Sequence, residues 1–205
     1  MEFVHLAVTV LGFLSVGHSA PVTNCETLIQ PIEFQRDQLL GKWIYLAEST
    51  DIAGTQLLTK MFFESTWWKL TAAENEDDGL RGVYFSKMAG FCSTFSVNLK
   101  LVNNTISAVR PYTMSATLLK TGCPDCIVSL GKHTIGRNMY TSVQLMSRRR
   151  RVTDAELNEF KKQAECLNLP SLAILDQEKD LCPDESYNKE TVPTEITNAT
   201  KRHGH

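Results

Sequence analysis

Short runs of alternating apolar and polar residues follow one another through the middle of the chain. Eight such runs, rich in β-branched and aromatic residues, are separated by clusters of Gly, Asn, Asp and Pro. The runs are Trp43–Glu48, Met61–Ala72, Leu80–Lys87, Cys92–Val102, Thr105–Arg110, Met114–Lys120, Cys126–Leu130 and Met139–Ser147. Alternation bounded by turn residues predicts strands joined by hairpins. Eight antiparallel strands can close into a barrel that holds one small ligand.

The apolar spacing becomes helical after Thr153. Thr153 and Glu156 have the spacing of a capping box. A single apolar face then recurs at Leu157, Phe160, Ala164 and Leu167. We therefore expect a helix that packs on the outside of the barrel, followed by a short strand at Leu172–Leu175. The predicted fold class is all-β: an eight-stranded antiparallel up-and-down barrel with one C-terminal α-helix packed outside.

The two ends of the chain differ from this middle part. Phe3 to Val16 is almost continuously apolar and is followed by small residues up to Ser19. This run is shorter than the ~20 apolar residues that span a bilayer, so it predicts a signal peptide. The last residues are polar and without periodicity. The expected organisation is a signal peptide at 1–19, one domain at 20–184 and a disordered tail at 185–205.

Composition and cysteine count restrict the compartment and the partners. The formal net charge is -2, which argues against nucleic acid or an anionic membrane as the main partner. An even number of cysteines, six, in a secreted chain indicates disulfides, although spacing alone allows 15 pairings. Sequons at Asn103 and Asn198 predict glycosylation in an extracellular, plasma-type protein.

Catalytic, metal and cofactor motifs are missing from the sequence. The chain has no nucleophile elbow, phosphate loop or His-Glu-x-x-His pattern, and its single C-x-x-C has no second pair at finger spacing. The acidic cluster Glu74–Asp78 is expected in a solvated turn. We therefore expect no enzyme activity, no cofactor and no metal. A thiol enzyme would need a free Cys123 or Cys126.

Several stretches of the chain are similar to a known family. Gly41-Lys42-Trp43 opens the first strand, and Leu40–Ala47, Asn104–Ser107, Thr153–Leu167 and Lys179–Pro183 carry the rest of the match. From about Cys25 to Cys182 the chain resembles the lipocalin family, above all the branch of orosomucoid (acid glycoprotein) and apolipoprotein M. Fish plasma proteins that bind tributyltin, or the poisons saxitoxin and tetrodotoxin, belong to that branch.

The resemblance implies roles for individual residues. Trp43 would close the base of the barrel, with Arg148, or else Arg149, lying across its ring as a cation–π partner. It also implies the disulfides Cys25–Cys166 and Cys92–Cys182. Cys123 and Cys126 are then left over; we expect a local bridge between them, with reduced thiols or a redox pair as the alternatives. The run Arg148–Arg151 departs from the family; it predicts a solvated basic turn, with a protease site or a heparin contact as alternatives.

The candidate ligand contacts are mostly aromatic. Strand residues alternate, so the cavity face of the second run holds either Phe63, Ser65, Trp67 and Lys69 or Phe62, Glu64, Thr66, Trp68 and Leu70. Both sets contain aromatic rings, so the pattern leaves the facing open. The expected contacts are Phe63, Trp67, Trp68, Tyr84, Phe95, Arg110 and Tyr112. A basic side chain near the mouth, Lys69 or Arg110, could meet a phosphate or carboxylate group.

Two functions of different kinds follow. The first is a secreted, monomeric carrier that binds a small hydrophobic or amphipathic molecule (a lipid, steroid, drug or toxin) in the barrel. The alternative is an immunomodulatory or lipoprotein-associated acute-phase-type glycoprotein that acts through surface contacts with a receptor or lipoprotein. A barrel packed solid by its own side chains would favour the alternative.

Overall fold

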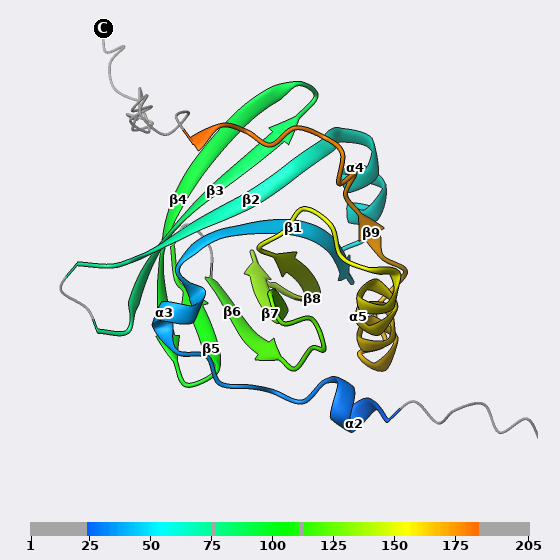
Figure 1. Ribbon diagram of the computed structural model, residues 1–205, viewed down its shortest axis with the longest axis horizontal. Helices are drawn as coiled ribbons and strands as arrows, with labels where there is room; N and C mark the ends of the chain where they lie inside the picture. The colour runs from blue at the N-terminus through cyan, green and yellow to red at the C-terminus, as the bar shows by residue number, and fades with distance from the viewer. Residues whose placement is uncertain (1–23, 75–76, 111–112, 185–205) are drawn as a thin grey trace, which may run out of the picture.

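Eight antiparallel strands follow one another around a closed sheet. The computed structural model describes residues 24–74, 77–110 and 113–184. The strands are β1 (Gly41–Thr50), β2 (Phe63–Ala72), β3 (Gly79–Met88), β4 (Phe91–Val102), β5 (Thr105–Ala108), β6 (Thr113–Leu119), β7 (Cys126–Ile135) and β8 (Asn138–Ser147). Neighbours in the chain pair with each other, and β1 pairs with both β2 and β8 (Figure 1). The predicted eight-stranded antiparallel barrel is confirmed.

Two segments differ from the expected strands. Met61 and Phe62 end a helix, α4 (Thr55–Phe62), rather than begin a strand. The Gln56 side chain holds this helix through hydrogen bonds to Ser171 and to the Leu172 carbonyl, contacts that local alternation cannot reveal. The other difference is β7, which continues past Gly131, where we expected a turn, to Ile135.

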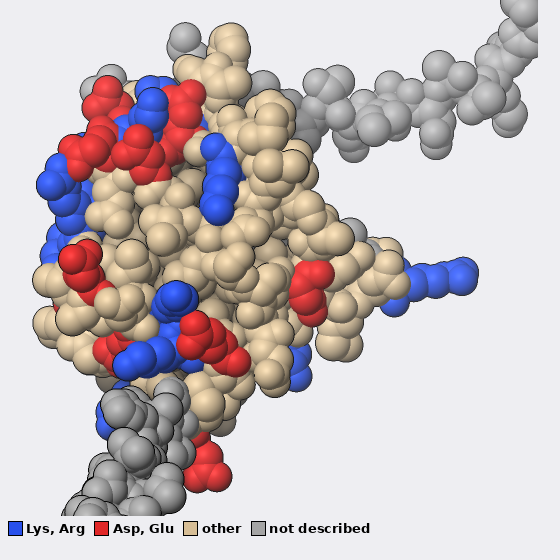
Figure 2. Space-filling view, turned by 90° about the vertical axis from the view of Figure 1, so that its right-hand side faces the viewer, with Lys and Arg blue, Asp and Glu red and all other residues tan. Residues whose placement is uncertain are grey.

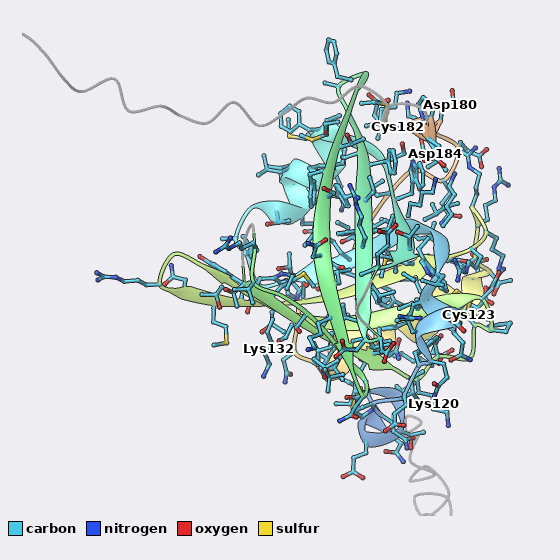
Figure 3. All side chains as sticks on the ribbon, turned by 90° about the vertical axis from the view of Figure 1, so that its left-hand side faces the viewer. Lys120, Cys123, Lys132, Asp180, Cys182 and Asp184 are labelled. Carbon is cyan, nitrogen blue, oxygen red and sulfur yellow. A yellow bond between two sulfur atoms is a disulfide. The ribbon has the colours of Figure 1, made fainter. Side chains whose placement is uncertain are left out.

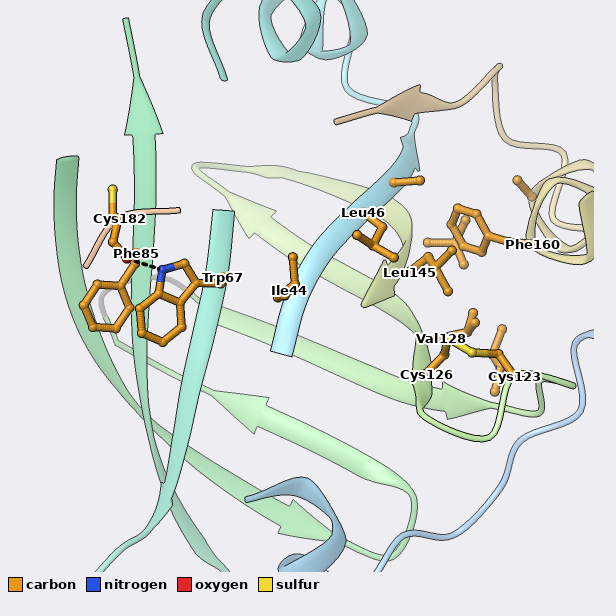
Figure 4. Packing of buried hydrophobic residues seen from close by; sticks show 14 of the residues in the cluster. Ile44, Leu46, Trp67, Phe85, Cys123, Cys126, Val128, Leu145, Phe160 and Cys182 are labelled. Carbon is orange, nitrogen blue, oxygen red and sulfur yellow. Dashed lines mark hydrogen bonds between the residues drawn. A yellow bond between two sulfur atoms is a disulfide. The ribbon is translucent and has the colours of Figure 1, made fainter. Parts of the chain in front are cut away.

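The outer layer consists of helix α5 (Asp154–Cys166) and the segment after it. The predicted capping box is present: the Thr153 amide donates to the Glu156 carboxylate, and the Glu156 amide donates to the Thr153 hydroxyl. Phe160 is buried against the outer face of the barrel beside Leu145 (Figure 4). The short strand β9 (Ala173–Ile174) adds to the edge of β1.

The segment before β1 crosses one end of the barrel. It contains α2 (Cys25–Leu28), which contacts α5, and α3 (Arg36–Leu39), which lies beside the start of β1 (Figure 1). We call this the closed end; here β1 begins and β2 ends. The opposite end, with α4 and the β3–β4 and β7–β8 hairpins, is the open end.

Disulfides tie these segments to the barrel. The bonds are Cys25–Cys166 and Cys92–Cys182, the two pairs that the resemblance implied, and Cys123–Cys126, the local bridge expected for the two remaining cysteines. No cysteine is free, so the thiol-enzyme hypothesis lacks the group that it requires. The predicted signal peptide, the predicted tail, Tyr112 and Asn198 lie outside the described residues.

Candidate ligand-binding site

The closed end is sealed by Trp43 and Arg148. Trp43 is buried, and its indole N–H donates to the Leu39 carbonyl at 2.7 Å. The Arg148 guanidinium carbon lies 3.6 Å from the centroid of the Trp43 ring. Its two Nη atoms donate at 2.7–2.9 Å to three main-chain carbonyls, those of Gln38, Leu40 and Lys42. This is the arrangement that the resemblance implied: the Trp43 ring and the Arg148 guanidinium lie together across the base of the barrel.

An aromatic wall lies above this base on the inner face. Trp68, Tyr84 and Phe95 are aligned across β2, β3 and β4. The ring centroids are 4.7 Å apart for Tyr84 and Phe95, and 5.0 Å for Trp68 and Tyr84. Phe95 is 39% exposed, whereas Val97, next on the same face of β4, is 5% exposed. The interior is therefore filled at the level of Val97 and open at the level of Phe95.

Gly82 makes room for this wall. A Cβ atom at Gly82 would lie 2.9 Å from Cζ3 of Trp68 and 3.2 Å from Cδ2 of Leu70. Real Cβ atoms do not approach a rigid ring so closely, so only glycine lets the Trp68 ring lie over β3.

The Glu48 carboxylate lies inside the barrel, toward its open end. Glu48 accepts a hydrogen bond of 2.6 Å from the Tyr45 hydroxyl and one of 3.0 Å from the Thr59 hydroxyl of α4. Burial, and next the charge of Glu48, raise the pKa of Tyr45 well above its ordinary value. Tyr45 therefore stays a neutral donor. The charge of Tyr84 also acts on Tyr45, so the carboxylate group and the aromatic wall are neighbours.

A bulge explains why Tyr45 and Glu48 share the inner face. Residues three apart in a regular strand point to opposite faces. The register of β1 against β8 shifts between Tyr45 and Ala47, which inserts one extra residue. Ala47 and Ser49 consequently face outward, where Ala47 joins the outer core and Ser49 donates to the Pro170 carbonyl.

His133 lies on the inner face of β7, across the barrel from β2. Its Nε2 atom and the Ser142 hydroxyl are 2.8 Å apart and share a hydrogen bond. Burial lowers the pKa of His133, while Glu48 and Asp51 act in the opposite direction. Gly131 provides the space for this ring, because a Cβ there would lie 2.7 Å from Nε2. The imidazole therefore adds a largely neutral polar group near the carboxylate.

The lysines and arginines of the barrel strands lie on the outer face. Within the described residues of β1 to β8 these are Lys42, Lys69, Arg81, Lys87, Lys100 and Lys132. Each alternates with residues of the inner face. No ion pair involves Glu48 among the described residues. The interior thus carries one carboxylate without a cationic side chain bound to it.

Trp67 does not line the interior, so that prediction is wrong. Its ring stacks on Phe85 at 3.9 Å on the outside of the barrel, and its indole N–H donates to the Cys182 carbonyl at 2.9 Å (Figure 4). The Cys92–Cys182 disulfide brings the C-terminal segment over this part of β2. That cover buries Trp67 without a ligand, and it leaves the inner face to Trp68.

The other expected contacts lie at the mouth or outside it. Phe63 begins β2 next to a register shift at the open end and belongs to neither core cluster. Arg110 is exposed just after β5. Lys69 faces outward, where its ammonium lies 2.7 Å from the Asp184 carboxylate. The sequon residue Asn103 lies in the exposed β4–β5 turn at the closed end with φ 56°, so its glycosylation stays a prediction.

The basic run is used in local contacts. Arg149 pairs with Asp125 at 2.8 Å and with Glu156 at 2.5 Å. Arg151 pairs with Glu178, and Arg150 donates to a main-chain carbonyl. Figure 2 shows basic and acidic side chains intermixed over the face that carries α5. Arg149, Arg150 and Arg151 thus lie in a surface turn with local partners, and the protease site and the heparin contact stay predictions.

The described residues hold one grouping of potential metal ligands and no apolar helix of membrane-spanning length. Over the described residues, Cys123, Asp125 and Cys126 form the single grouping of potential metal ligands, and the disulfide occupies both sulfurs. No helix in the described parts of the chain is long and apolar enough to cross a membrane.

Comparisons with known proteins agree with this geometry. Residues 24–186 match the ApoM domain. No curated protein matches the chain significantly.

Similar solved structures include lipocalin 12 from rat epididymis, with 16% identity and a TM-score of 0.64 over 77% of this chain and 95% of that one. The siderocalin Ex-FABP has 16% identity and a TM-score of 0.63 over 72% and 99% of the two chains. Siderocalin Q83 has 17% identity and a TM-score of 0.62 over 73% and 96%. At these identities the likeness concerns the fold alone. Proteins of this family and fold are binding proteins for small hydrophobic molecules rather than enzymes. The chain belongs to the ApoM domain family and has the lipocalin fold.

Proposed function

We propose that the protein is a secreted carrier whose barrel binds a small amphipathic molecule with an apolar body and a cationic amine group. The observation that carries this proposal is the Glu48 carboxylate, which has no lysine or arginine partner among the described residues and lies beside the open aromatic wall. Extracellular location is supported by three disulfides, which persist in oxidising compartments.

The apolar part of the ligand would contact the aromatic wall. Trp68, Tyr84 and Phe95 present ring surface to a space that their own side chains do not fill. A barrel packed solid would have favoured the alternative of a scaffold acting through its surface. The exposure of Phe95 supports the carrier instead.

The cationic part would sit at Glu48. A carboxylate removed from bulk water is stabilised by a bound cation, and no lysine or arginine of β1 to β8 supplies one from the inner face. Tyr45 and Thr59 hold the carboxylate in one orientation. Aromatic faces nearby add cation–π attraction for an ammonium group.

The test compares two ligands with the same alkyl chain, decylammonium with a cationic head group and decanol with a neutral one, by displacement of the neutral fluorescent probe N-phenyl-1-naphthylamine from the delipidated protein. We expect both to displace the probe, with decylammonium stronger by about tenfold. Glu48→Gln should remove this advantage and leave decanol unchanged.

Glu165→Gln, a glutamate on the exposed side of α5, is the matched control and should change neither ligand. An unchanged ratio in Glu48→Gln would refute the cation site while leaving the carrier intact. Failure of the probe and both ligands to bind would refute the carrier.

A further inference from the structure

Exposed apolar side chains gather at the open end of the barrel. Six of them form what we call the apolar rim: Leu57, Leu58, Met61, Phe62, Met88 and Phe91. Phe91 is 80% exposed, Met61 63% and Leu57 62%. Large apolar side chains exposed together on a soluble domain mark an interaction surface.

The two halves of the rim are in contact. Leu57, Leu58, Met61 and Phe62 come from α4, while Met88 and Phe91 flank the tip of the β3–β4 hairpin. The Ala89 amide at that tip donates to the Phe62 carbonyl at 3.2 Å. Met88 is also paired with Phe63 at the start of β2. The helix and the hairpin therefore present one continuous apolar edge.

The rim is held in place rather than collapsed onto the barrel. Ala89 and Gly90 both have positive φ, 48° and 84°, as in the tight turn of a two-residue hairpin. The Gly90 amide donates to the Glu64 carboxylate at 2.6 Å. On α4, Gln56 and Thr59 face the protein through hydrogen bonds. This leaves the apolar residues of the helix on the side that faces water.

Three exposed basic side chains lie on segments of the open end. Lys60 on α4, Arg110 after β5 and Arg137 in the β7–β8 hairpin are exposed, and no ion pair involves them among the described residues. The described acidic groups toward this end include Glu48, which lies inside the barrel, and Glu64 and Asp51 at the edge. Glu64 is paired with Lys87, and the Asp51 carboxylate accepts from the Thr141 amide.

The net charge of -2 is an average over the whole chain. At the closed end acidic and basic groups are mixed: Asp37 follows Arg36 in α3, and Asp78 pairs with Lys100. The exposed Lys60, Arg110 and Arg137 lie toward the open end, so the average charge does not exclude an anionic surface as a partner for that end.

We propose that the open end of the barrel docks on an anionic lipid surface, with the apolar rim entering the headgroup region and Lys60, Arg110 and Arg137 meeting lipid phosphates and carboxylates. Apolar tips flanked by basic side chains are the chemistry of interfacial membrane binding. In Figure 3 the β3–β4 and β7–β8 hairpins project beyond α4, as separate tips around the mouth.

A fluid bilayer accommodates such separated tips, whereas a second copy of the chain would bring like charges together in a symmetric contact. Docking at this end would place the mouth of the barrel against the lipid. The rim lies on the outside of the barrel, so docking at this end does not depend on what the interior binds.

The test is co-sedimentation of the full chain with phosphatidylcholine vesicles with and without about 30% phosphatidylserine. We expect binding to the anionic vesicles that weakens as salt rises. Phe91→Ser and Met61→Ser should each reduce vesicle affinity about tenfold, and Lys60→Gln about threefold. The matched controls are Val102→Ser, an exposed apolar residue at the closed end, and Lys161→Gln on α5, which should change nothing.

Several results would overturn the proposal. One is no binding to anionic vesicles; another is equal losses for the rim variants and the closed-end controls. A third is a concentration-dependent dimer, seen by sedimentation, that Phe91→Ser dissolves while vesicle binding is absent, because the rim would then join two copies. Probe displacement by decylammonium should be unchanged in Phe91→Ser, which separates a failure here from a failure of the carrier.

Discussion

The closed and open ends of the barrel are made by the same strands but use their polar groups differently. At the closed end the indole N–H of Trp43 and the guanidinium of Arg148 are satisfied by main-chain carbonyls. Toward the open end, Glu48 accepts hydrogen bonds from two hydroxyls and has no lysine or arginine partner among the described residues. This difference supports the proposal that the open end binds the ligand, while the closed end stabilises the fold.

Removal of the closing tryptophan is the strongest way to test this division. Trp43→Ala should lower the free energy of unfolding by about 3–5 kcal/mol, because it leaves a large cavity in the inner core. Trp68→Ala should cost only about 1–2 kcal/mol, because Trp68 is partly exposed beside an open space. Urea denaturation followed by circular dichroism measures both. Equal losses would show that the aromatic wall is ordinary core.

Much of this division could be predicted from the sequence, but not all. The strands and the outer helix follow from periodicity, and the Trp43–Arg148 pair from the family resemblance. The facing of Trp67 and Trp68 could not be predicted, because each of the two alternating faces of β2 carries aromatic rings. The cover over Trp67 comes from Cys182, far along the chain.

The position of Glu48 on the inner face could not be predicted from the sequence either, for a different reason. Glu48 ends an apolar run that alternates only as far as the bulge, and a bulge has no reliable sequence signal. Without the bulge, Tyr45 and Glu48 would lie on opposite faces of β1. The sequence pattern places Thr59 in a connection between two strands rather than in a helix. The side-chain contacts that hold α4 come from residues 171 and 172, which the local pattern does not reveal.

A smaller effect is expected at the guanidinium of the closed end. Arg148→Met keeps the aliphatic stem but removes the charge over Trp43 and three hydrogen bonds, so we expect a loss of about 1–2 kcal/mol. Arg148→Lys should not recover this stability, because an ammonium group cannot reproduce the planar arrangement of donors in a guanidinium. Arg151→Met, in an exposed ion pair, is the control and should leave the denaturation midpoint unchanged. A similar loss from both variants would contradict a special role for Arg148.

Gly82 is expected to position the aromatic wall because it has no side chain. Gly82→Ala should cost about 1 kcal/mol and alter the near-ultraviolet circular dichroism, because the new methyl group meets the Trp68 ring. In a Trp68→Leu background the same substitution should cost less, and a double-mutant cycle measures the coupling. Additive losses would mean that Gly82 is needed for another reason.

The smallest expected effect concerns His133, near the open end. Burial is the main cause that lowers its pKa from 6.5 in the folded protein, so below about pH 6.5 the unfolded chain binds a proton more readily than the folded one. This histidine therefore makes stability fall as the pH falls below that value, and it has no such effect above it. In His133→Gln the free energy of unfolding should fall less below pH 6.5, by a difference of under about 1 kcal/mol. Above pH 7 its dependence on pH should be unchanged. Denaturation midpoints measured across this range give the answer. A steeper decline in the variant would mean that the imidazolium is stabilised inside the barrel, and the open end would then supply its own cation to Glu48.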